Sequence, residues 1–425
     1  MKIRFGWRMD RNHVDSSSKC VYDMFSQYYT ANADILPPPR SVEKREFAFA
    51  LFSGHVMLRH KCFDNQKGLG VFLKEVIPSD AYYSCAYYTF PAEDMDRKGW
   101  LGADLIFDID ADHIPTTCGK VHDKWVCGGC GFVGKGIVPD ECPVCGGQKF
   151  DTRTWLCEEC LNSAKTESIK LIDMLQGDFG FSEKEIQIFF SGHRGYHVHV
   201  ESESIKTLDT IARREIVDYV SGFGLRMSSF DLDNKRSSKA RVRRDLRRSD
   251  SGWSSHIAKG VHDLISAANL DRYTDIGLNK NTAKVLIQNK DTILKSWESI
   301  EPYPTIKRIG FETWRKLIAY CAESLSAKID TVVTTDIHRL IRLPGTLHSK
   351  TGLKKIEFPI SHLEDFDPLK SAVAFKNGAV TILVSDAPEF RIGDKTFGPY
   401  RNQRIELPTA AALLLICKKR AEVAE

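Results

Sequence analysis

The chain has 425 residues, of which 42% are hydrophobic and 27% charged, and its formal net charge at pH 7 is +4. That length is enough for two or three domains with a large core, and the composition is ordinary for a globular protein. The first residues lack the apolar segment of a secretory signal, and the longest apolar run near the C-terminus, residues 410–417, is too short to span a bilayer. We therefore expect a soluble intracellular protein without membrane contact.

The first half of the chain predicts a helix, a hairpin and further α and β segments. Residues 22–30 have a helical pattern that ends before the three prolines at 37–39, and residues 45–59 alternate like a β-hairpin. Residues 163–176 have the apolar spacing of an amphipathic helix, and residues 186–200 predict strand, turn and strand.

The composition changes abruptly at residues 235–248, which hold eight Lys or Arg and one Asp. Such a run is either an arm that follows nucleic-acid phosphates or a solvated loop. Residues 256–326 look helical and carry no chemical motif, and β character returns at 331–333 and 355–360. The sequence therefore predicts a mixed α+β core, interrupted by a metal-binding module and a small helical subdomain.

Two carboxylates end an apolar strand in residues 104–113, which read DLIFDIDADH. Side chains alternate faces along a strand, so Asp108 and Asp110 share one face while Phe107 and Ile109 take the other. Two like charges at the end of a buried strand are costly unless a cation lies between them. Carboxylate oxygens suit Mg²⁺ or Mn²⁺, and a pair of such ions serves displacement at phosphorus. Solvated acids at an exposed strand end are the alternative.

Residues 191–200, SGHRGYHVHV, combine a glycine-rich turn with groups that bind phosphate. Gly192 and Gly195 would let backbone N–H groups approach an anion closely. The side-chain donors are a hydroxyl, a guanidinium and an imidazole, from Ser191, Arg194 and His197. The spacing of His193 and His197 also resembles a zinc pair, but it brings two ligands together on a helix, and this segment predicts a hairpin. We interpret it as a phosphate-binding turn.

Seven of the twelve cysteines fall between residues 118 and 160, which indicates metal binding rather than a disulfide framework. Two CxxC pairs, each followed by a glycine, form a zinc-ribbon pattern. Its ligands would be Cys127, Cys130, Cys142 and Cys145. The remaining ligands are Cys118, His122, Cys157 and Cys160. Sequential pairing, with 118, 122, 127 and 130 at one site and 142, 145, 157 and 160 at another, is an open alternative.

Together these motifs resemble the catalytic small subunit of archaeal and eukaryotic DNA primases. FDID, followed about 80 residues later by SGHRGYH, carries the resemblance. Arg45-Glu46-Phe47 resembles the REF segment ahead of the acidic strand, and residues 329–352, IDTVVTTDIHRLIRLPGTLHSKTG, resemble the third motif. The resemblance covers roughly residues 22–235 and 300–360, with four motifs in the family's order.

The resemblance implies roles for individual residues. Asp330 would be the third metal-binding carboxylate beside Asp108 and Asp110, with Asp336 as a competing candidate. The nucleotide would be bound by basic and polar side chains, namely Arg45, Ser191, Arg194, His197, Arg342 and His348. A family zinc site in the order Cys, His, CxxC favours a nested arrangement, in which the ribbon at 127–145 is inserted within the site formed by Cys118, His122, Cys157 and Cys160. Both zinc ions would be structural.

Two positions depart from the eukaryotic pattern. Position 193 is histidine where eukaryotic relatives carry a second arginine, so one charge on the triphosphate would be missing there or would depend on pH. Position 199 is histidine where they tend to have tryptophan, and the sequence gives no account of it.

We expect a discontinuous domain organisation. The primase-type catalytic core would comprise three segments, 23–116, 163–235 and 327–400. The other parts would be an N-terminal extension at 1–22, a zinc-binding module at 117–162 with the ribbon at 127–145, a basic loop with a helical insertion at 236–326, and a C-terminal segment at 401–425.

The resemblance implies a nucleotidyltransferase that synthesises short RNA primers, with DNA primers as a second product, de novo on single-stranded DNA for replication. Its cofactors would be two Mg²⁺ or Mn²⁺ ions and two Zn²⁺ ions. Its partners would be single-stranded DNA, NTPs or dNTPs, and a separate large primase subunit with an iron–sulfur cluster, in the cytoplasm or nucleoid if the chain is archaeal. The alternatives are a primase-related repair polymerase that extends existing primers, and a non-catalytic zinc-ribbon adaptor that binds nucleic acid without needing Asp108 or Asp110.

Overall fold

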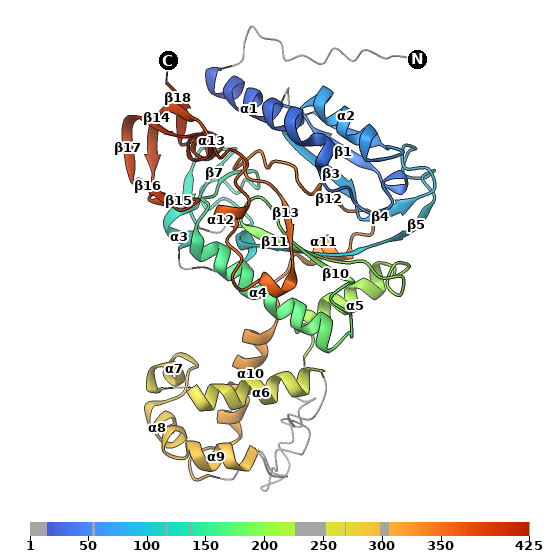
Figure 1. Ribbon diagram of the computed structural model, residues 1–425. Coiled ribbons are helices and arrows are strands. Elements are labelled where there is room, and N and C mark those ends of the chain that lie inside the picture. Colours follow the sequence, from blue (N-terminus) through green and yellow to red (C-terminus); the bar gives the residue numbers. More distant parts are fainter. Residues whose placement is uncertain are drawn as a thin grey trace. The chain divides into compact units, whose positions relative to one another are not determined.

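The computed structural model describes residues 15–52, 56–114, 116, 118–136, 138–225, 252–267, 269–297 and 306–424 (Figure 1). The basic stretch at 235–248 lies outside the described residues. The chain divides into two compact units, one from Met1–Ser168, Glu183–Arg214 and Ile329–Glu425, the other from Ile169–Ser182 and Glu215–Lys328. Antiparallel sheets combine with helices throughout the first unit, so the predicted mixed α+β fold is confirmed.

The first helix, α1 (Ser16–Asn32), begins earlier than the apolar pattern predicted. Asp15 caps it by accepting a hydrogen bond from the Ser18 backbone N–H, which satisfies one of the unpaired donors at the helix start. Phe25 and Tyr29 are buried on its inner face. The short polar first turn carries no apolar residue inward, which is why hydrophobic spacing alone placed the start too late.

One four-stranded antiparallel sheet has the order β12-β3-β1-β2. Its strands are β1 (Phe47–Ala50), β2 (Met57–Lys61), β3 (Asp80–Ser84) and β12 (Leu340–Arg342). The predicted hairpin at 45–59 is confirmed by the pairing of β1 with β2. Helix α2 (Gln66–Val76) follows the hairpin, and β4 (Ala86–Tyr88) pairs with β5 (Trp100–Ala103) beyond it.

A second four-stranded antiparallel sheet has the order β13-β10-β11-β6 and carries the acidic strand at its edge. Its strands are β6 (Leu105–Asp110), β10 (Ile186–Phe190), β11 (Gly195–Val200) and β13 (Ile356–Phe358). Phe107 and Ile109 are fully buried, as expected for the face opposite the acids. The predicted strand, turn and strand at 186–200 is the β10–β11 hairpin.

The cysteine-rich module follows the acidic strand. A three-stranded sheet of order β8-β7-β9 is formed by β7 (Lys124–Cys127), β8 (Val133–Lys135) and β9 (Phe150–Arg153), after the short helix α3 (Gly119–His122). Helix α4 (Glu158–Gly177) begins between Cys157 and Cys160 and includes the helix predicted at 163–176.

The last part of the chain forms a third sheet, of order β17-β14-β18, from β14 (Ala379–Ala387), β17 (Tyr400–Pro408) and β18 (Ala421–Val423). The apolar run near the C-terminus is the buried helix α13 (Thr409–Cys417), and α1 lies beside β18, where Val423 N–H donates to the Ser17 hydroxyl (Figure 1). Helix α12 (Pro368–Ser371) and the pair β15 (Phe390–Ile392) and β16 (Lys395–Phe397) complete this region. Within the described residues, no helix is long and apolar enough to cross a membrane.

Helices dominate the second unit, as the sequence indicated for 256–326. They are α6 (Gly252–Ala267), α7 (Leu270–Asp275), α8 (Lys280–Gln288), α9 (Lys290–Trp297) and α10 (Phe311–Leu325), and α5 (Thr210–Val220) leads into them. One strand prediction is wrong: residues 331–333 lie in the short helix α11 (Thr331–Thr335). Its β-branched residues favour a strand locally, but the Asp330 side chain caps a helical turn by accepting from the Val332 and Val333 N–H groups.

Candidate active site

The acidic strand and the glycine turn meet through the register of β6 and β11. His197 pairs with Asp108, and Gly195 pairs with Asp110. The Nε2 atom of His197 lies 3.5 Å from the Asp108 Oδ1 atom. Two motifs that are about 80 residues apart in the chain therefore lie on adjacent strands of one sheet.

The third motif reaches the same strand through its helix α11. The Asp330 N–H donates to the Asp108 carbonyl oxygen at 2.8 Å, while the Asp330 carboxylate caps α11. The competing candidate, Asp336, follows the other end of that helix, where its carboxylate accepts from the His338 N–H at 2.9 Å. The structure thus places Asp330 directly beside Asp108.

Asp110 and Asp330 act electrostatically on Asp108. Burial raises the pKa of the Asp108 carboxyl to about 7, and the charges of Asp110 and Asp330 add to that rise, against Arg339 and Lys355. A site that concentrates three carboxylates, one of them largely buried, fits divalent cations with oxygen ligands. The residues present therefore suit Mg²⁺ or Mn²⁺.

Both glycines of the turn are required by close approach. A Cβ atom at Gly195 would lie 2.2 Å from the Ile109 carbonyl oxygen and would force β11 away from the acidic strand. Gly192 has a φ of +87°, and a Cβ atom there would lie 3.1 Å from the Cβ atom of His348. The Thr351 hydroxyl donates to the Gly192 carbonyl oxygen at 2.5 Å, which fixes the turn against the third motif.

The Ser191 side chain organises the turn from within. Its hydroxyl oxygen accepts from the His193 and Gly195 N–H groups at 3.2 and 3.3 Å. A hydroxyl has two acceptor lone pairs and one donor hydrogen, so the hydrogen is left to donate to an anion.

The side chains of His193 and Arg194 point to different neighbours. Arg194 is 1% exposed, and its guanidinium pairs with Asp112 and with Asp123, the latter at 2.7 Å. His193 Nε2 lies 2.7 Å from the Lys418 Nζ atom, and the His193 ring stacks on His348 with 5.1 Å between the ring centroids. The turn is thus held on one side by acids and on the other by the third motif and the C-terminal segment.

Of the two expectations for position 193, the structure favours a missing charge over a pH-dependent one. His193 is buried, and burial together with Lys418, Lys350 and Arg342 holds its pKa well below the usual range. An imidazole in that environment stays neutral at ordinary pH and can accept a hydrogen bond.

Arg342 and His348 lie near each other, and His193, Lys350 and Lys418 also act on His348. Arg342 pairs with Asp80 at 2.6 Å, and Asp80 also accepts from the Ser349 N–H at 3.1 Å, which holds the loop after His348. Burial and then Arg342 keep the pKa of His348 well below the usual range. The neutral His348 ring accepts from the Lys350 N–H through Nδ1 at 3.1 Å, so its Nε2 atom carries the hydrogen available to a ligand.

Arg45 is not placed for nucleotide binding. It is 0% exposed, and its guanidinium is used by Asp104 at 2.6 Å and by the carbonyl oxygens of Ser84 and Cys85. Four of its five N–H groups are used in the core, and none of their partners belongs to the acids or to the glycine turn. The REF segment therefore serves the packing of the first sheet.

His199, whose role could not be predicted, joins the two sheets. Its Nδ1 atom lies 3.3 Å from the hydroxyl of Tyr83 in β3, and its ring packs on Phe189 with 4.6 Å between centroids. It is fully buried and belongs to the core between the sheets.

The cysteine-rich module contains two candidate metal centres. Cys118, His122, Cys157 and Cys160 form one group and Cys127, Cys130, Cys142 and Cys145 the other, with the ligand atoms of each group within 4.8 Å of one another. This is the nested pairing, and the sequential alternative does not match it. Four ligands around Zn²⁺ at about 2.3 Å would place sulfurs about 3.8 Å apart. The Cys118–Cys160 and Cys130–Cys142 sulfur distances of 3.4 and 3.7 Å suit such a centre.

Asp123 links the first of these centres to the glycine turn. One of its oxygens accepts from His122 Nδ1 at 2.7 Å, and the other accepts from Arg194 at 2.7 Å. A carboxylate behind a metal-binding histidine fixes the ring so that Nε2 faces the metal. The sequence offered one signal for this role, the position of Asp123 directly after His122, and we did not predict it.

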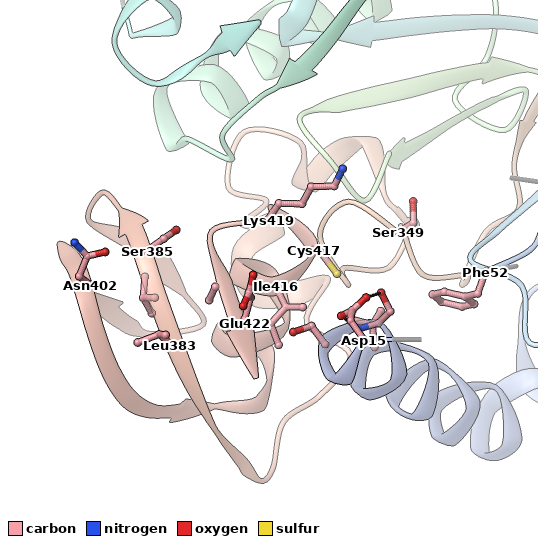
Figure 2. Close-up of a pocket in the computed structure, with 15 residues that line it drawn as sticks. Asp15, Phe52, Ser349, Leu383, Ser385, Asn402, Ile416, Cys417, Lys419 and Glu422 are labelled. Carbon is pink, nitrogen blue, oxygen red and sulfur yellow. Dashed lines mark hydrogen bonds between the residues drawn. The ribbon is translucent and has the colours of Figure 1, made fainter. Parts of the chain in front are cut away.

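A cavity of about 680 Å³ elsewhere in the first unit contains none of the predicted site residues. Figure 2 shows that it lies beside α1, with Asp15, Phe52, Cys417 and Lys419 among its lining residues. The candidate active site is therefore defined by its acids and its turn, not by this hollow.

Three neighbouring carboxylates beside a glycine turn with hydroxyl, guanidinium and imidazole groups would suit a metal-dependent enzyme that acts on phosphates. Comparison with known proteins agrees with this class. A profile of the DNA primase small subunit matches residues 149–360. The DNA primase small subunit PriS of Archaeoglobus fulgidus is 36% identical over 399 residues, which cover 93% of this chain and 95% of that protein.

Two further relatives are similar along nearly their whole length. The small subunit PriS of Methanothrix thermoacetophila is 33% identical and covers 94% of this chain and 97% of its own. The small subunit PriS of Nitrosopumilus maritimus is 29% identical, and the match covers 96% of this chain and 100% of that protein. The chain belongs to the family of archaeal-type DNA primase small subunits, the catalytic subunits of primase.

Proposed function

We propose that this chain synthesises short primers de novo on single-stranded DNA for replication, from NTPs and, as a second activity, from dNTPs. The observation that supports it most is the register of β6 and β11, which aligns Asp108 with His197 and Asp110 with Gly195. Acids that suit a metal-bound triphosphate and a turn that suits its phosphates are thus on adjacent strands.

Asp108, Asp110 and Asp330 would hold two Mg²⁺ or Mn²⁺ ions. When bound, such ions lower the pKa of an attacking 3′-hydroxyl and neutralise the leaving pyrophosphate. The Ser191 hydroxyl and the Nε2–H of His348 would donate to phosphate oxygens. His197 is buried, and burial and then Lys355 hold its pKa well below the usual range, so its ring would be neutral. With the hydrogen on Nε2, the atom that lies 3.5 Å from Asp108 Oδ1, it would donate one hydrogen bond to a phosphate oxygen.

The basic side chains would act mainly by charge. Arg342 is held by Asp80, and Arg194 is held by Asp112 and Asp123, so both guanidinium groups are oriented before a nucleotide arrives. Oriented charges in a largely buried site stabilise the transition state without reorganisation.

We also propose that both cysteine-rich centres bind Zn²⁺ and are structural. Each offers four ligands, and four-coordinate sites leave no position for a substrate. The ribbon at 127–145 is an insertion, whereas the centre at 118–160 is connected to the turn through Asp123.

The relatives are named as small subunits. We therefore propose a separate large primase subunit with an iron–sulfur cluster as the partner, in a heterodimer on single-stranded template. The basic stretch at 235–248 remains a proposed contact for template phosphates.

One experiment tests the proposed function. The purified chain is incubated with NTPs, Mn²⁺ and either unprimed or primed single-stranded DNA, and the products are sized on a gel. We expect short products on the unprimed template. Extension of the primed template alone would instead support a repair polymerase, and binding without synthesis on either template would support a nucleic-acid adaptor.

A further inference from the structure

The side chain of Lys418 reaches the glycine turn from the C-terminal part of the chain. Lys418 directly follows α13 and is 9% exposed. Its Nζ atom lies 2.7 Å from His193 Nε2. This lysine lies outside residues 329–352 and all other motifs that indicated the site.

The direction of the Lys418–His193 hydrogen bond follows from burial. Because His193 is neutral, its Nε2 atom accepts and the ammonium group donates. The His193 ring in turn stacks on His348. Lys418 is thus connected to the turn and to the third motif by a single imidazole.

Cations and anions both act on Lys418. Arg194 and Lys350 act on it as neighbouring cations, and the acidic groups that act on it are Asp123 and the Cys417 thiol. The Asp123 oxygens already accept from His122 and Arg194. Burial of an ammonium group among other cations is costly unless an anion joins them. A ligand with several negative charges would stabilise the ammonium form of Lys418.

We propose that Lys418 binds the triphosphate of the incoming nucleotide and supplies the cation that position 193 lacks. His193 positions that ammonium group by accepting one of its hydrogen bonds. Two N–H groups of Lys418 are then directed to phosphate oxygens. This inference rests on the proposed function, because it assigns a further residue to the same nucleotide site.

The neighbours of Lys418 provide a matched control. Cys417 and Lys419 line the cavity beside α1, as Figure 2 shows, whereas Lys418 is directed to His193. Lys419 is exposed. Its substitution removes the same charge one residue away without touching the turn.

The test compares Lys418→Gln, Lys418→Arg and Lys419→Gln in the full chain. Glutamine keeps a donor for His193 and removes the charge. Dissociation constants are measured for a non-hydrolysable NTP analogue and for inorganic tripolyphosphate. We expect Lys418→Gln to weaken both about tenfold or more, Lys418→Arg to retain most of the affinity, and Lys419→Gln to change neither more than about twofold.

Equal affinities for Lys418→Gln and Lys419→Gln would overturn the inference while leaving the proposed function intact. If Lys418→Gln does not fold, acylation of Lys418 in the wild-type chain is followed by mass spectrometry. Protection by tripolyphosphate supports the inference, and an unchanged rate overturns it. A wild-type chain that makes no primers would instead contradict the proposed function. If Lys418→Gln also lost tripolyphosphate binding, Lys418 would belong to an anion site without that function.

Discussion

Asp108 and His197 face each other across two antiparallel strands, with 3.5 Å between Oδ1 and Nε2. The contact defines how the site is assembled, because one residue belongs to the acidic strand and the other to the strand after the glycine turn. The N–H of Asp330 joins from a third segment, 2.8 Å from the Asp108 carbonyl oxygen. Pairings between distant parts of the chain thus bring the three motifs together.

The acid cluster should cost stability when no cation is bound. Asp108→Asn keeps the shape of the side chain and removes one of three neighbouring charges, so in chelator we expect the variant to be more stable by on the order of 1 kcal/mol. Added Mn²⁺ should raise the Tm of the wild-type chain more than that of the variant. Equal Mn²⁺ shifts in thermal unfolding would show that the acids do not hold the ion.

The closeness of β11 to the acidic strand should make Gly195 irreplaceable. The added Cβ atom of Gly195→Ala would meet the Ile109 carbonyl oxygen at 2.2 Å, and we expect a loss of about 1–3 kcal/mol with little primer synthesis left. Gly177→Ala is the control, because Gly177 is exposed in α4 and an added Cβ meets nothing within 4 Å. Denaturant unfolding of both variants measures the difference, and similar values would contradict the required close approach.

Asp123 should couple one metal centre to the turn. Asp123→Asn weakens the hold on His122 and Arg194 together, so we expect zinc affinity to fall about 10- to 100-fold and NTP binding to weaken as well. Wild-type chain should contain about two zinc ions, from two four-ligand groups. Cys142→Ser serves as the control that should lose one zinc ion but keep NTP affinity. A normal NTP affinity in Asp123→Asn would disprove the coupling.

The affinity for tripolyphosphate should fall as pH rises. Burial, together with Arg194 and Lys350, lowers the pKa of Lys418 to about 7, so the ammonium form is lost as pH increases through that value. The groups that face it are His193, Arg194, Lys350, Asp123 and Cys417. Lys418→Arg stays charged throughout and should flatten the dependence. The measurement is the dissociation constant for tripolyphosphate from pH 6 to 8 in chelator, for the wild type and for Lys418→Arg. Parallel pH curves for the two proteins would show that Lys418 does not cause the pH dependence.

The sequence predicted the parts of the site that depend on local pattern. Alternation placed Asp108 and Asp110 on one face, and CxxC spacing indicated the metal module, because period and ligand spacing are properties of short segments. The family resemblance assigned Arg45 to nucleotide binding, but in the packed structure its guanidinium pairs with Asp104 in the core. The β-branched run at 331–333 predicted a strand, but the Asp330 cap determines a helix.

The missed residues are those whose roles depend on long-range packing. Lys418 follows an apolar run that predicts only a buried segment, and nothing in its neighbourhood indicates contact with residue 193. The neutral state of His193 likewise follows from burial that a turn sequence does not predict. Such features appear only when distant segments meet.

The most direct measurement of the central claim is dinucleotide formation from NTPs and Mn²⁺ on unprimed single-stranded DNA by wild type, Asp330→Asn and Asp336→Asn. The account predicts product from the wild type and from Asp336→Asn, whose amide oxygen can still accept from the His338 N–H. It predicts at least a hundredfold loss, about 2.7 kcal/mol in transition-state stabilisation, for Asp330→Asn. Near-normal synthesis by Asp330→Asn, or its loss in Asp336→Asn alone, would contradict the three-carboxylate site.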